Sequence, residues 1–108
     1  MFVPTVTVSD VTDEVYLLDV RDLDEWDAGH APEAIHVPMM EIPGRISELP
    51  EDRDIVVVCR VGSRSAQVVA YLIAQGRDRV ANLGGGMFAW HAAGRSVVAG
   101  DGRAGFVL

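Results

Sequence analysis

The feature that most constrains this chain is Ile55–Val58, a run of four β-branched residues that leads directly into the only cysteine, Cys59. A continuous apolar run of this kind is typical of a parallel strand that is buried on both faces. Short apolar runs alternate with helix-like segments along the rest of the chain, which predicts an α/β domain with a mostly parallel sheet. The sequence therefore places Cys59 at the carboxyl end of a central strand.

The other elements follow from similar patterns and from turn residues. Further strands are expected over residues 3–6, 16–20, 34–37 and 80–83. A short helix is expected from an Asp22 cap through Asp27, and longer or further helices over 39–49, 65–75 and 87–92, the first of these interrupted or started near Pro43. Residues 1–108 are expected to form one domain, with a tail from about residue 99 that is either draped on the surface or frayed.

Composition narrows the functional classes. The net charge is −7 and all nine bases are arginines, which argues against binding to nucleic acid or to anionic membranes. No apolar stretch approaches the roughly 20 residues needed to span a bilayer, and the N-terminus lacks the pattern of a secretory signal. A single cysteine cannot form an internal disulfide, which fits a reducing compartment. The expected location is the cytoplasm.

The segment after Cys59 is suited to stabilising a thiolate. Residues 60–65, Arg-Val-Gly-Ser-Arg-Ser, predict a short loop that enters a helix, and the N–H groups of such a loop can form an anion-binding nest. The helix start adds partial positive charge, and Arg60 and Arg64 add full charges. A cysteine that serves only as a small packed apolar residue gains nothing from two neighbouring arginines. We therefore predict that Cys59 is a nucleophile that handles an anionic substrate or intermediate.

Each loop residue has an expected role. Gly62 permits close backbone approach and a positive φ, while Val61 and Ser63 contribute to the loop that holds the anion. Ser65 is expected either to cap the helix, the favoured role, or to donate a hydrogen bond to sulfur. Arg60 is expected to point outward and meet the substrate.

Arg64 is expected to be held in place by a carboxylate, with Asp19 and Glu25 as the two candidates. Asp19 lies at the carboxyl end of its expected strand, where it could orient Arg64 or cap a neighbouring turn, and the structural role is the favoured one. His30 and His36 lack zinc-site spacing and a second cysteine, so they and His91 are expected to make local hydrogen bonds or to lie on the surface. No metal and no other cofactor is expected.

Five segments in order carry a resemblance to a known family. They are residues 17–21 (LLDVR), residues 25–26 (EW) with 29–32 (GHAP), residues 34–38 (AIHVP), residues 59–65 (CRVGSRS), and residues 83–86 (LGGG) followed by Trp90. Together they resemble the rhodanese family in its single-domain form, over roughly residues 16–98. Two positions depart from the family pattern: Glu33 stands where glycine is frequent, and Ala31 where a larger aliphatic is.

The resemblance implies a central parallel five-stranded sheet flanked by helices, and sulfurtransferase chemistry. By this resemblance Cys59 takes a sulfane sulfur from a donor such as thiosulfate, carries it as a persulfide and yields it to cyanide or a thiol. Residues 60–65 would cradle the persulfide, and Asp19, Arg21 and Glu25 would support the loop.

Three other functions remain as alternatives. The first is a persulfide carrier whose donor and acceptor are both proteins. The second is a non-catalytic interaction module, which has no need of the thiol and two arginines. The third is a cysteine-based phosphatase or arsenate reductase, but those enzymes place five residues between cysteine and arginine, whereas Cys59 and Arg64 enclose four.

Overall fold

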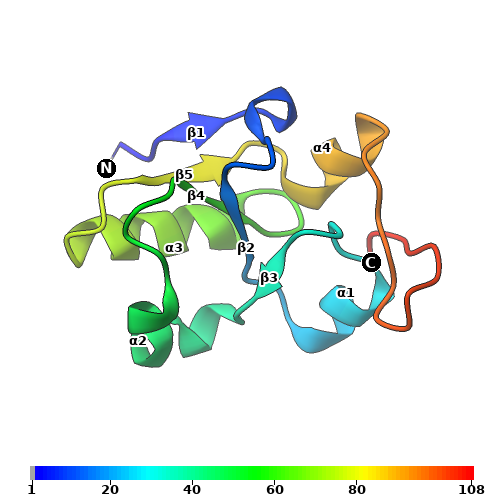
Figure 1. The fold of residues 1–108 in the computed structure, drawn as a ribbon, viewed down its shortest axis with the longest axis horizontal. Coiled ribbons are helices and arrows are strands. Elements are labelled where there is room, and N and C mark those ends of the chain that lie inside the picture. Colours follow the sequence, from blue (N-terminus) through cyan, green and yellow to red (C-terminus); the bar gives the residue numbers. More distant parts are fainter. Residues whose placement is uncertain (1) are drawn as a thin grey trace.

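The computed structural model describes residues 2–108, which build one five-stranded sheet in the order β1-β5-β4-β2-β3 (Figure 1). Every neighbouring pair of strands is parallel. The strands are β1 (Thr5–Val6), β2 (Tyr16–Asp19), β3 (Ile35–His36), β4 (Ile55–Val58) and β5 (Val80–Leu83). This arrangement confirms the predicted α/β class with a central parallel five-stranded sheet.

Helices cover both faces of the sheet. They are α1 (Leu23–Ala28), α2 (Ile42–Arg45), α3 (Ser63–Ala74) and α4 (Gly86–Ala92), with 3₁₀ turns η1 (Val8–Asp10), η2 (Met39–Glu41) and η3 (Ile46–Glu48). One core cluster joins the sheet to α2 and α3, and a second joins its other face to α1 and α4. Within the described chain, no helix has the length and apolar character required to cross a membrane.

The central strand β4 contributes to both clusters because successive side chains of a strand point to opposite faces. Ile55 and Val57 belong to the cluster under α3, while Val56 and Val58 belong to the cluster under α4. All four side chains are buried, as the continuous apolar run predicts. The strand is thus fixed from both sides up to the residue before Cys59.

The helix expected over residues 39–49 is instead three short pieces, η2, α2 and η3. In a continuous helix over residues 39–49, Pro43 would lie in the interior and would remove a backbone hydrogen bond. In the structure it lies in the first turn of α2, where its missing N–H is tolerated. Helix α3 begins at Ser63, two residues earlier than expected, because Gly62 at its N-cap adopts φ +113°. That conformation is open to glycine and reverses the chain immediately before the helix.

The C-terminal segment lies along α1 and the turn that follows it (Figure 1). Val98 forms an antiparallel bridge with His30, and the Phe106 N–H donates to the Ala28 carbonyl oxygen at 3.0 Å. Gly29 allows this close approach, since a Cβ there would lie 2.2 Å from the Phe106 carbonyl oxygen. The tail thereby reaches the edge of the sheet at which Cys59 lies.

Candidate active site

Cys59 occupies the carboxyl edge of the sheet, where the loops that follow parallel strands converge. Its side chain is fully buried. The loop after Cys59 lies between two helix starts: α3 begins three residues after Arg60, and the first residues of α4 contact the loop backbone. The Met87 N–H donates to the Cys59 carbonyl oxygen at 2.9 Å, and the Phe88 N–H donates to the Arg60 carbonyl oxygen at 3.1 Å. The loop is therefore clamped between two helices.

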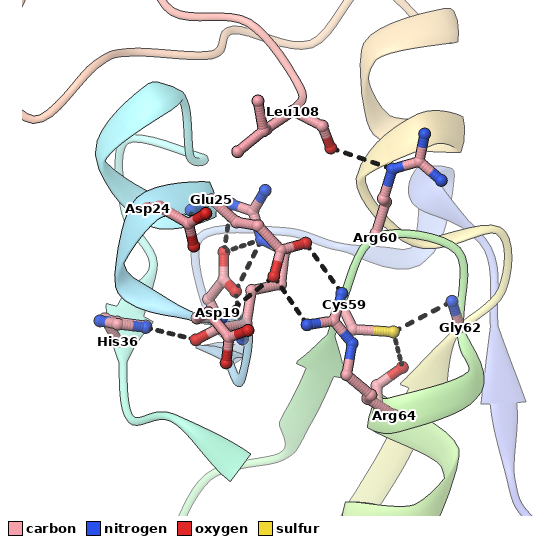
Figure 2. A network of polar contacts seen from close by, with 12 residues as sticks. Asp19, Asp24, Glu25, His36, Cys59, Arg60, Gly62, Arg64 and Leu108 are labelled. Carbon is pink, nitrogen blue, oxygen red and sulfur yellow. Dashed lines mark hydrogen bonds and ion pairs between the residues drawn. The ribbon is translucent and has the colours of Figure 1, made fainter.

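Two donors converge on the cysteine sulfur (Figure 2). The Gly62 N–H donates to Cys59 Sγ at 3.1 Å, and the Ser65 hydroxyl donates to it at 3.2 Å. The prediction that Ser65 caps the helix is therefore wrong, and its alternative, a hydrogen bond to sulfur, is what the structure has. The reason is the early helix start: Ser65 is the third residue of α3, and helical side chains tilt back toward the N-terminus.

The surroundings of Sγ act on its pKa in opposite directions. Burial raises the pKa of the Cys59 thiol, but the hydrogen bonds from the Ser65 hydroxyl and the Gly62 N–H, together with the nearby N–H dipoles of Ser65 and Val61, outweigh it. The pKa of Cys59 consequently lies below its ordinary value. Because the thiolate is the nucleophilic form of a cysteine, the lowered pKa increases the fraction of Cys59 that is reactive at a given pH.

A pH profile of alkylation tests this directly. The rate of Cys59 alkylation by iodoacetamide should reach half its maximum at a lower pH in the folded protein than in the unfolded one. The sign follows from the chemistry, since a lowered pKa yields thiolate at lower pH and only the thiolate reacts. The same chain in denaturant is the control, with its midpoint near the ordinary thiol pKa of about 8.5. Coincident midpoints would contradict the prediction.

Arg64 is held by Glu25, one of its two expected partners. The Arg64 guanidinium donates to both carboxylate oxygens of Glu25, at 2.7 and 2.8 Å. The pair is partly buried, with side-chain exposures of 28% for Arg64 and 12% for Glu25, and the hydrogen bonds from Arg64 lower the pKa of Glu25. Two parallel bonds of this kind fix the orientation of the guanidinium. The pair ties α1 to the start of α3.

Asp19, the other candidate, is engaged elsewhere. Its carboxylate accepts hydrogen bonds from Arg21 Nε at 2.9 Å and from Arg21 Nη2 at 2.8 Å, and both side chains are fully buried. Arg21 Nη2 also donates to the Gly29 carbonyl oxygen at 2.7 Å, at the end of α1. Asp19 and Arg21 therefore support the position of α1, and α1 in turn carries Glu25 to Arg64.

Arg60 lies at the rim of the site and points away from the sulfur, as Figure 2 shows. Its Nε donates to the Leu108 carbonyl oxygen at 2.9 Å, and its guanidinium carbon lies 4.6 Å from the centre of the Phe88 ring. Val61 and Ser63 are exposed beside it. The outward position matches the expectation, whereas the contacts with Phe88 and Leu108 have no signal in the local sequence.

Asn82 is a site residue that sequence reasoning did not single out. It lies on β5 beside the loop, and it is 7% exposed. Its Oδ1 accepts a hydrogen bond from the Ser65 hydroxyl, and its Nδ2 donates to the Gly62 carbonyl oxygen at 3.3 Å. The available signal was a polar residue inside the otherwise apolar strand Val-Ala-Asn-Leu.

The histidines make local interactions next to this site. The Trp26 ring is stacked against those of His30 and His36, with centroid separations of 3.5 and 4.8 Å. His30 Nδ1 donates to the Trp26 carbonyl oxygen and His36 Nε2 to the Arg21 carbonyl oxygen, each at 2.7 Å. Because a carbonyl oxygen only accepts, these bonds fix the proton on those two nitrogens. The stack packs α1 against β3, as expected of local hydrogen-bonding residues.

The model of the rhodanese-like domain matches residues 8–93 of this chain, the greater part of its length. The chain belongs to the rhodanese-like domain family. A sulfurtransferase from Allochromatium vinosum is 48% identical over 91 residues, which cover 84% of this chain and 85% of that protein. A Bacillus subtilis protein named as the putative sulfur carrier protein YrkF is 33% identical over 75% of this chain and 44% of its own length.

Rhodanese-like folds with solved structures superimpose closely on this chain. The crystal structure of a thiosulfate sulfurtransferase from Pseudomonas aeruginosa aligns with a TM-score of 0.83 and 28% identity, over 98% of this chain and 22% of the other. The five motifs that carried the resemblance thus fall within a rhodanese-like domain, and its relatives include proteins named as sulfurtransferases and as a sulfur carrier.

Proposed function

We propose that this protein is a sulfurtransferase that moves a sulfane sulfur from a small anionic donor such as thiosulfate to cyanide or a thiol, through a persulfide on Cys59. The observation that carries the proposal is the position of Sγ, which accepts hydrogen bonds from the Gly62 N–H and the Ser65 hydroxyl at the start of the 12-residue helix α3. These donors and the helix terminus favour negative charge on sulfur. The name of the solved Pseudomonas aeruginosa relative supports thiosulfate as the donor.

The reaction needs no redox partner or cofactor. The Cys59 thiolate attacks the outer sulfur of thiosulfate, so that an Sγ–S bond forms as the S–S bond of thiosulfate breaks. The electron pair of the broken bond leaves with sulfite, and the negative charge of the new persulfide rests on its terminal sulfur. In the second half-reaction the acceptor attacks that sulfur, and the thiolate of Cys59 is the leaving group. The loop N–H groups around Sγ, of which that of Gly62 lies 3.1 Å from it, stabilise the negative charge on sulfur.

Intact-mass measurement tests the proposal. The reduced protein is incubated with thiosulfate beside Cys59→Ser, and both are then treated with cyanide. We expect the parent chain to gain the mass of one sulfur atom, to lose it with cyanide, and the variant to gain none. An unchanged mass would argue against thiosulfate as the donor, and a gain in the variant would argue against Cys59 as the carrier.

A second candidate function is the transfer of persulfide from one protein to another, with thiosulfate as an incidental donor. The similarity to the putative sulfur carrier protein favours this candidate. A carrier should load slowly from thiosulfate and much faster from the persulfide of a cysteine desulfurase. Equal or faster loading from thiosulfate would favour the enzyme acting on the small donor.

Arg60 is expected to assist the approach of the anionic donor, because it is exposed at the rim of the loop and carries a full charge. Replacement of Arg60 by alanine should raise KM for thiosulfate about 3- to 10-fold, the effect of losing roughly one kcal/mol of charge interaction. The melting temperature should change little, since the contacts of Arg60 are at the surface. Steady-state kinetics and thermal unfolding measure the two quantities.

Arg79→Ala is the matched control for Arg60→Ala. Arg79 is also exposed and lies just before β5, at the opposite edge of the sheet from Cys59. Its replacement changes the net charge by the same amount, so it should leave KM unaltered. An unchanged KM in Arg60→Ala, or an equal rise in both variants, would remove Arg60 from the binding step.

A further inference from the structure

The Ser65 hydroxyl lies between two acceptors that compete for its single proton. Its oxygen is 3.2 Å from Cys59 Sγ and 2.5 Å from Asn82 Oδ1. Ser65 and Cys59 are fully buried and Asn82 is 7% exposed. A hydroxyl donates only one hydrogen bond, so at any moment Ser65 serves either the sulfur or the amide oxygen.

Gly62 fixes which atom of the Asn82 amide faces Ser65. Asn82 Nδ2 donates to the Gly62 carbonyl oxygen at 3.3 Å. Turning the amide round would bring Oδ1 against that carbonyl oxygen, and two acceptors repel one another. Asn82 therefore presents an acceptor to Ser65. The Ser65 proton is the only one that can fill the contact between the two side chains.

We propose that Asn82 is a positioning residue that takes up the Ser65 hydroxyl whenever Cys59 Sγ is uncharged and releases it when Sγ is a thiolate. A charged acceptor forms the stronger hydrogen bond, so the thiolate draws the hydroxyl to itself. A neutral thiol is a weak acceptor, so the hydroxyl then turns to the amide oxygen. The switch is a rotation about the Ser65 C–O bond, and no proton leaves the oxygen.

The switch would also act during sulfur transfer, a consequence that rests on the proposed function. When Cys59 Sγ bonds to the incoming sulfur and sulfite departs with its electron pair, the negative charge moves from Sγ to the terminal sulfur. The Ser65 hydroxyl is then released to Asn82, which regains its hydrogen bond. A buried acceptor without a donor is unfavourable, so Asn82 stabilises the loaded state relative to the thiolate. It thus opposes the thiolate and favours the persulfide.

A double-mutant cycle on the pKa of Cys59 tests the coupling without any sulfur transfer. Asn82→Leu should lower the measured pKa by about half to one unit, the effect of one neutral hydrogen bond, because the Ser65 hydroxyl then has only sulfur as its acceptor. In the Ser65→Ala background the same Asn82→Leu change should have no effect. Thiolate absorbance against pH gives all four values.

An equal shift in both backgrounds would overturn the proposal, because Asn82 would then act through Gly62 or through packing. So would a pKa that does not fall in Asn82→Leu. The double-mutant cycle measures only the pKa of Cys59, so its result does not depend on whether thiosulfate loads Cys59. Failure of this proposal can therefore be distinguished from failure of the proposed function.

The parent protein provides a second test that does not depend on a variant folding. In ¹⁵N-labelled protein, the side-chain amide resonances of Asn82 should titrate with the same midpoint as Cys59, because Oδ1 loses its donor as the thiolate forms. Once Cys59 is loaded, they should return toward their positions in the thiol form. Amide resonances that stay fixed while Cys59 titrates would overturn the proposal.

Discussion

Replacement of Asp19 by asparagine is expected to lower the free energy of unfolding by about 3–5 kcal/mol, because it leaves the charge of Arg21 buried without its counterion. Both side chains have an exposed fraction of zero, and the Arg21 Nη2 to Asp19 Oδ2 distance is 2.8 Å. Arg21 Nη1 is buried and has no hydrogen-bond partner among residues 2–108. Little else is therefore available to stabilise the charge of Arg21 once Asp19 is neutral. Equilibrium unfolding in urea measures the loss.

Two further variants separate burial of charge from loss of an ion pair. Asp54→Asn breaks an exposed ion pair, in which the Asp54 side chain is 67% exposed and the Arg79 side chain 51%. This replacement should hardly change the free energy of unfolding, because water screens exposed charges. The double replacement Asp19→Leu with Arg21→Met should recover most of the stability lost in Asp19→Asn, because it removes the unpaired charge as well. Equal losses in Asp19→Asn and Asp54→Asn would contradict the explanation.

The parts of the site that could be predicted from the sequence are those that local patterns determine. The bounds of the strand Ile55–Val58 could be predicted to the residue, because a continuous run of β-branched residues is typical of a strand that is buried on both faces. The thiol then had to lie at the carboxyl edge of the sheet, followed by a loop and a helix. The role of Gly62 also followed, since a tight turn into a helix favours positive φ.

The parts that were missed depend on contacts between distant segments. Asp19 is the last residue of β2 and Glu25 lies six residues further on in α1, so sequence distance could not decide which of them holds Arg64. Burial decided it, because Asp19 lies inside the fold beside Arg21, while Glu25 on α1 faces the loop. The partnership of Ser65 with Asn82 needed two pieces of information, the early start of α3 and the neighbouring positions of β4 and β5.

Replacement of Gly86 by alanine is expected to damage both stability and activity, because this glycine lies directly against the loop backbone. A Cβ at residue 86 would lie 2.5 Å from the Cys59 carbonyl oxygen and 2.6 Å from that of Arg60, far inside contact distance, and its φ is +56°. Backbone strain at such a position costs about 1–3 kcal/mol, and overpacking adds a similar amount. Relief requires the loop to move away from α4.

Movement of the loop should lower the rate of sulfur transfer on the order of 100-fold, the effect of a displacement of about 1 Å at a reacting group. The midpoint of Cys59 alkylation should rise together with that loss, since the donors to Sγ would no longer converge. Gly76→Ala is the matched control: its φ is +88° but no atom lies within 4 Å of the added Cβ. It should therefore show the backbone strain alone and keep parental activity. If Gly86→Ala loses no more stability and activity than Gly76→Ala, the contact between α4 and the loop does not hold the sulfur in place.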